Sequence, residues 1–196
     1  MNRALRWLLV QWPYATLLAA GFLLLLVPFF LPLGLPLTLV YLQLPVYMVH
    51  QFEEHDRDRF RTFINATIGG GREALTPLAV FVINSVGVWG VDLAALYLAK
   101  FVHPALGLIA IDLAVVNGIT HVIAALILRR YNPGLWTSLC LLLPVGIWAL
   151  VTVSAATQAD WKMHTLALGT AILVHVLIIA HIKLRLALME KSASGI

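Results

Sequence analysis

Long uninterrupted apolar stretches dominate this sequence and restrict what the chain can fold into. Six can be delimited, at residues 4–29, 33–49, 75–99, 105–128, 135–156 and 165–188. Each approaches or exceeds the ~20 residues that a helix needs to cross a bilayer. A membrane barrel would instead show alternating polarity in segments of about 10 residues. We therefore predict an all-α, polytopic membrane bundle of about six transmembrane helices.

The composition supports this class and excludes several others. Of the 196 residues, 61% are hydrophobic and 11% are charged, whereas soluble domains average about 45–50% and about 25%. The net charge is +4, but the basic residues lie between apolar stretches. We therefore expect membrane lipids as partners and no nucleic acid. Cys140 is the single cysteine, so no disulfide framework can form within the chain. Residues 1–196 are predicted to form a single transmembrane domain.

The lysines and arginines predict the orientation of the chain. Eleven of the thirteen fall near the two ends and in alternate connections, and only Lys100 and Lys162 fall in the other connections. Short cytoplasmic segments of membrane proteins are enriched in Lys and Arg. The asymmetry therefore favours a protein of the bacterial inner membrane with both termini cytoplasmic.

The connection at about residues 55–73 is the one long connection. Apolar residues recur in it at helical spacing among charges, at Phe60, Phe63, Ile64 and Ile68. This pattern predicts an amphipathic helix at the membrane interface, followed by three glycines at 69–71. Two interpretations remain open: a surface connector with a flexible hinge, or a mobile lid with an anion site at Arg72.

Ionisable side chains within the apolar stretches are the candidates for function, because each costs about 2.5–3.5 kcal/mol in a bilayer. His50, His121 and His175 belong to three different predicted helices. His121 precedes Arg129 by eight residues, and His175 precedes Lys183 by eight. At ~1.5 Å per residue, both imidazoles lie about 12 Å inward from the basic boundary. His50 stands at a similar distance from the next arginine, so the three histidines share one depth.

Carboxylate and amide side chains accompany these histidines. Glu53 and Glu54 follow His50 at i+3 and i+4 and therefore share its helix face. Asn117 precedes His121 by four residues and can orient the imidazole or hold a substrate carbonyl. Zinc and iron both accept mixed imidazole and carboxylate ligands. We predict a divalent metal site, with zinc preferred over iron, whose ligands come from His50, Glu53, Glu54, His121 and His175.

Three motifs together resemble the HXXEE-domain family of small bacterial integral membrane proteins. They are the run from His50 to Glu54, the pair Asn117 and His121, and the sequence Tyr-Asn-Pro-Gly at 131–134. The resemblance extends from about the second predicted helix to the fifth. The function of this family is uncharacterised, so the resemblance supports the choice of residues and implies no activity.

The leading hypothesis is a metal-dependent membrane hydrolase that acts on a lipid-like or amphiphilic substrate. The histidines and one glutamate would hold the ion, and the other glutamate would take a proton from bound water. Glu53, Glu54 and Asn117 are then the candidate catalytic residues.

Three alternatives remain open. They are a di-iron lipid oxidase, a metal-free acid–base enzyme of the isomerase kind, and a proton-coupled small-molecule transporter. The transporter would use Asp92 and Asp112, which the sequence places level with each other in a helical hairpin. Two aspartates so placed are expected to share a proton.

Overall fold

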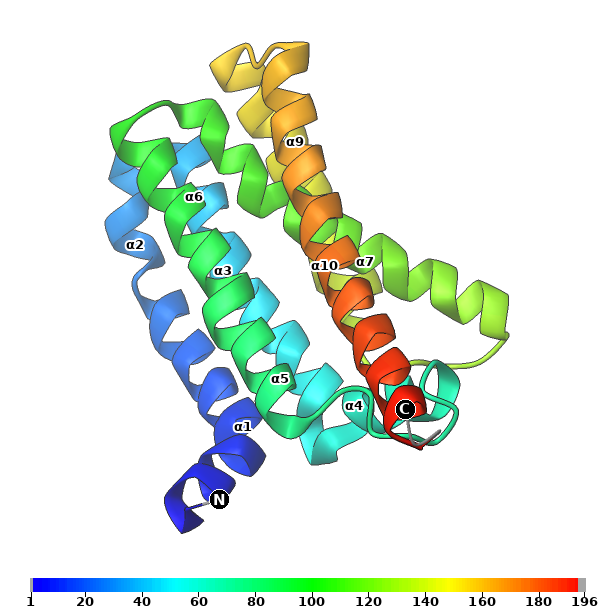
Figure 1. Ribbon diagram of the computed structural model, residues 1–196. Helices are drawn as coiled ribbons and strands as arrows, with labels where there is room; N and C mark the ends of the chain where they lie inside the picture. The colour runs from blue at the N-terminus through cyan, green and yellow to red at the C-terminus, as the bar shows by residue number, and fades with distance from the viewer. Residues whose placement is uncertain (1, 194–196) are drawn as a thin grey trace.

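The computed structural model describes residues 2–193, and this part of the chain is helical and contains no strand. It confirms the predicted all-α bundle (Figure 1). The longer helices are α1 (Arg3–Leu25), α3 (Leu35–His55), α6 (Trp89–Phe101), α7 (Leu108–Leu128), α9 (Leu143–Thr157) and α10 (Trp161–Ala193). The short α-helices are α2 (Val27–Phe30), α4 (Arg59–Thr67), α5 (Pro77–Val82) and α8 (Leu135–Thr137).

Tighter or wider helical turns connect these helices. Three are 3-10 turns: η1 (Leu31–Leu33), η2 (Asp56–Asp58) and η4 (Pro104–Gly107). Two are π-helical: η3 (Ile83–Val88) joins α5 to α6, and η5 (Ser138–Leu142) joins α8 to α9. Single π turns of this kind occur often beside functional sites.

Five helical stretches of the described chain are long and apolar enough to cross a membrane. They are Arg3–Leu25, Pro77–Phe101, Pro104–Leu128, Leu135–Thr157 and Trp161–Ala193. These five correspond to five of the six predicted stretches, and they indicate an integral membrane protein. The sixth, α3, has 21 residues but is not among them. Its polar residues, Gln43, Gln51 and the run from His50 to His55, lower its hydropathy.

The position of α3 in the bundle explains why this helix can be polar. It contacts α1, α6, α7 and α9, and fourteen of its 21 residues are buried. Its polar side chains therefore face other helices instead of lipid. Gln51, for example, donates to the Asn84 side chain and accepts from the Trp89 indole, at 2.9 and 2.6 Å.

The two ends of the described chain lie at one end of the bundle. Figure 1 shows the beginning of α1, the end of α10 and helix α4 at the same end. Six crossings, with α3 as the sixth beside the five long apolar stretches, would give this arrangement.

The predicted connector contains helix α4, and side-chain contacts join α4 to the segment that precedes α5. The Asn65 side chain donates to the Leu75 carbonyl oxygen and accepts from the Leu75 N–H, at 2.9 and 2.8 Å. Arg61 forms ion pairs with Asp58 and Glu73. The three glycines thus lie within a closed loop, which does not support a flexible hinge.

Candidate metal centre

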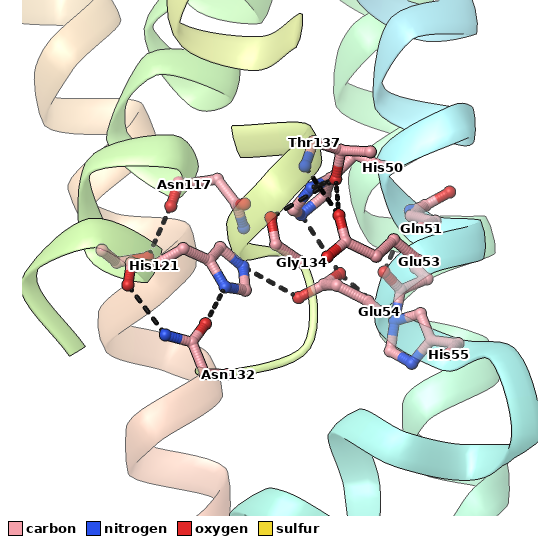
Figure 2. Close-up of polar contacts among 12 residues, drawn as sticks. His50, Gln51, Glu53, Glu54, His55, Asn117, His121, Asn132, Gly134 and Thr137 are labelled. Atoms are coloured by element: carbon pink, nitrogen blue, oxygen red, sulfur yellow. Dashed lines mark hydrogen bonds and ion pairs between the residues drawn. The ribbon is translucent and has the colours of Figure 1, made fainter. Parts of the chain in front are cut away.

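Two neighbouring helices bring an imidazole–carboxylate–imidazole group together at their buried faces. His50 and Glu54 are one turn apart on α3, and His121 is on α7. One ligand atom from each side chain lies within 4.8 Å of the other two, and all three residues are buried. Figure 2 shows the three side chains pointing toward one another. Within residues 2–193, this is the one group of three or more such side chains with metal-ligand spacing.

The distances within the group suit one small cation. His121 Nε2 lies 3.0 Å from Glu54 Oε1, and His50 Nε2 lies 3.5 Å from Glu54 Oε2. Two ligands on a tetrahedral ion, each at ~2.1 Å from it, are separated by about 3.4 Å. The side chains would therefore need only small movements to hold an ion between them.

Asn132 fixes which nitrogen of His121 carries the proton. The Asn132 amide nitrogen donates to the His121 carbonyl oxygen at 2.9 Å, so the Asn132 amide oxygen faces the imidazole. That oxygen lies 2.6 Å from His121 Nδ1 and must accept its proton. The neutral imidazole then presents the lone pair of Nε2 to Glu54.

Thr137 and Glu53 fix His50 in the same way. The Thr137 hydroxyl donates its single proton to Glu53 Oε2 at 2.5 Å. Its oxygen, 2.8 Å from His50 Nδ1, must therefore accept a proton from that nitrogen. The lone pair of His50 Nε2 is then directed toward Glu54 Oε2, and Nε2 is buried without a hydrogen-bond partner.

These assignments leave two nitrogen lone pairs and a carboxylate facing one another. The repulsion within such a set is removed by a metal ion between its members, or by a proton on His121 Nε2, which lies 3.0 Å from Glu54 Oε1. Metal-bound histidines almost always donate their second N–H to an oxygen, as His50 and His121 do here. The donor set therefore fits a divalent metal ion.

Gly134 closes one side of the group. Its φ of 98° lies in the left-handed region that favours glycine. A Cβ at this position would lie 2.7 Å from His121 Cε1 and 2.8 Å from both Glu54 Cγ and His50 Cε1. The backbone of Gly134 is thus packed directly against all three candidate ligands.

Comparison with known protein families gives a match that includes the segments bearing His50, Glu54 and His121. A family model described as a protein of unknown function with HXXEE motif matches residues 41–149. The chain belongs to this family. The expected resemblance is therefore confirmed. No curated protein and no solved structure matches the chain.

The two glutamates of the HXXEE motif have different surroundings. Glu54 faces the two imidazoles, whereas Glu53 accepts four hydrogen bonds from the segment that follows Gly134 and from Tyr131. Burial and then the hydrogen bond to Glu53 raise the pKa of Tyr131 to about 12, so its hydroxyl stays protonated near neutral pH. Glu53 thus holds the segment after Gly134 against α3, and it is not a member of the group formed by His50, Glu54 and His121.

An apolar cavity of about 340 Å³ adjoins the group, and the other predicted site residues line it. Glu54, His121, Asn117 and His175 all contribute to its wall. His175 Nδ1 contacts the Ala171 carbonyl oxygen at 2.8 Å within its own helix, and His175 lies outside the candidate ligand set. The amide oxygen of Asn117 is buried without a hydrogen-bond partner.

Sequence reasoning missed three residues of this HXXEE protein. His55 is buried with Nε2 at 3.4 Å from Glu54 Oε2. Asn132 belongs to the Tyr-Asn-Pro-Gly sequence at 131–134, and Thr137 is the last residue of α8, inside the predicted apolar stretch 135–156. The Tyr-Asn-Pro-Gly sequence was the signal that could have indicated Asn132, because a glycine two residues after an asparagine is typical of a turn with a fixed backbone conformation.

The expected aspartate pair is not formed. Both carboxylate oxygens of Asp92 are buried without a hydrogen-bond partner, so they do not share a proton with Asp112. Arg72, the expected anion site, pairs with Glu190 at 2.9 Å and donates to the Gly69 carbonyl oxygen.

Proposed function

We propose that this chain is a metal-dependent enzyme of the membrane that hydrolyses a lipid-like or amphiphilic substrate. The proposal rests on one observation about the three candidate ligands. Gly134 covers one side of the group, and Glu54 and His121 line an apolar cavity. Structural zinc sites commonly have four protein ligands, whereas catalytic sites keep three and an open position. The group His50, Glu54 and His121 has the catalytic pattern.

A divalent ion with an open position can activate water and polarise a carbonyl oxygen. His50, Glu54 and His121 would hold the ion, and Asn132 and Thr137 would orient the two imidazoles. Because Gly134 covers the opposite side, a substrate would reach the ion only from the cavity. Asn117, whose amide oxygen lacks a partner, is placed to accept a hydrogen bond from the substrate.

We prefer zinc, although two histidines and one carboxylate also suit mononuclear iron. Di-iron bundle sites draw six side chains from four helices, and the described residues bring together three. Membrane lipids are the proposed surroundings, and the inner membrane with cytoplasmic termini is the proposed location.

Metal content of the detergent-purified protein tests the proposal. We expect about one zinc or iron ion per chain, which is lost in the His121→Ala and His50→Ala variants. His175→Ala is the matched control and should keep its metal, because His175 lies outside the group. Full retention in both ligand variants, or undiminished turnover after chelation, would overturn the proposal.

A further inference from the structure

The walls of the cavity beside the candidate ligands differ in chemistry. Helices α3 and α7 contribute polar groups, including Glu54, His121 and Asn117. Helices α4 and α10 contribute mainly apolar side chains, among them Phe60, Phe63, Ile64, Ile178, Ile179 and Ile182, and His175 is the polar residue that α10 adds. A ligand that fills this cavity must therefore have a reactive polar group at one side and a hydrocarbon part at the other.

The size of the cavity restricts the hydrocarbon part. A volume of about 340 Å³ lies near the lower limit of the ~300–1,000 Å³ that is usual for small-molecule sites. One short or medium chain fits this space, whereas the two chains of a phospholipid do not.

The charges around the cavity restrict the polar part. Among the described residues, no lysine or arginine lines it. Three arginines of the nearby connector have other partners: Arg59 pairs with Asp56, Arg61 with Asp58 and Glu73, and Arg72 with Glu190.

A divalent cation, the Glu54 carboxylate and one hydroxide together carry no net charge. An anionic phosphate group would therefore add a buried charge with no lysine or arginine among the described residues of the cavity wall to compensate it, which is costly, whereas an uncharged carbonyl group would not.

We propose that the substrate is an uncharged single-chain acyl ester or amide, and not a phosphate ester. Its carbonyl group lies at His50, Glu54 and His121, and its chain lies between α4 and α10. This inference rests on the proposed hydrolase function. The oxygen of water bonds to the carbonyl carbon, the C–O or C–N bond breaks, and the proton released by water passes to the leaving alcohol or amine.

Two probes of equal chain length test the charge argument. Dodecan-2-one has an uncharged carbonyl head group on a decyl chain, and decyl phosphate has an anionic head group on the same chain. Binding is measured from the visible spectrum of the cobalt-substituted protein at a fixed detergent concentration. We expect the ketone to bind roughly tenfold more tightly or better. Equal or tighter binding of the phosphate, or no binding of either probe to the cobalt-loaded protein, would overturn the substrate class and leave the metal site intact. A protein that takes up no metal would instead overturn the proposed function.

Two substitutions on α7 test the position of the chain. Ala124 lines the cavity one turn after His121, and Ile127 is 74% exposed on the outside of the same helix. We expect Ala124→Phe to weaken dodecan-2-one binding roughly tenfold while metal content and melting temperature stay unchanged. Ile127→Phe adds a ring outside the cavity and should bind like the parent protein. Equal affinity of both variants, or equal loss in both, would contradict the placement of the chain.

Discussion

At the scale of single residues, Gly134 is the position on which the candidate metal centre depends most directly. It combines a positive φ with contact to all three candidate ligands, so an added methyl group meets two separate obstacles. The backbone penalty alone is about 1–2 kcal/mol. The contact with the ligands adds a loss that is specific to metal binding.

The Gly134→Ala variant should therefore lose metal affinity by roughly 10–100-fold or more, measured by competition with a chelator of known affinity. Gly71→Ala is the matched control, because Gly71 has a φ of 83° and open space where the Cβ would be. It shares the backbone penalty without touching the ligands. If both variants bound metal equally, the proposed contact between Gly134 and the ligands would be unimportant.

Sequence spacing predicted the candidate ligands only in part, and the reason is geometric. The i, i+4 spacing of His50 and Glu54 and the shared depth of His121 follow from helix geometry, and the structure brings these three together. Glu53 is one position away from Glu54, so it is rotated by about 100° around α3 and faces the segment after Gly134. His175 has the expected depth, but depth does not determine the direction in which a side chain points.

At the scale of elements, α4 covers the apolar side of the cavity, and Asn65 joins it to the segment before α5. The two hydrogen bonds between the Asn65 side chain and Leu75 link the ends of the glycine loop directly, beside the ion pair of Arg61 with Glu73. Loss of two hydrogen bonds is expected to cost about 1–3 kcal/mol.

We expect Asn65→Ala to accelerate amide hydrogen exchange in residues 59–75 by roughly tenfold or more, with metal content unchanged. Thr67→Ala serves as the control, since the Thr67 hydroxyl bonds only to the Phe63 carbonyl oxygen of the same helix. Unchanged exchange in the Asn65 variant would show that other contacts hold α4 in place.

The sequence predicted the existence of the long helices better than their internal geometry. Apolar length alone locates five membrane-spanning stretches, because the bilayer sets their minimum length. The π-helical turns at 83–88 and 138–142 could not be predicted, since apolar length indicates where a helix runs and not where its backbone hydrogen bonds widen to the i, i+5 pattern.

At the scale of the whole molecule, the distribution of basic residues can be tested as a topology. Thr62 in the α4 connector and Lys162 at the start of α10 are exposed, and they belong to opposite sides of the membrane in the predicted orientation. Each can be replaced by cysteine in a chain whose native Cys140 is changed to serine.

We expect Lys162→Cys to react with a membrane-impermeant maleimide in intact cells, and Thr62→Cys to react only after the cells are permeabilised. The reverse pattern would place both termini outside the cytoplasm. Labelling of both positions in intact cells would contradict the three crossings expected between them, at Pro77–Phe101, Pro104–Leu128 and Leu135–Thr157.

The central position of α3 also has a consequence for biogenesis. Its last two turns bear His50, Glu53, Glu54 and His55, which lipid does not accommodate well. The partners of His50, Glu53 and Glu54 include His121 and Thr137, which are synthesised after this segment. In a nascent chain that stopped after α3 these three side chains would lack those partners, so we expect stable integration of the second helix to require the later part of the polypeptide.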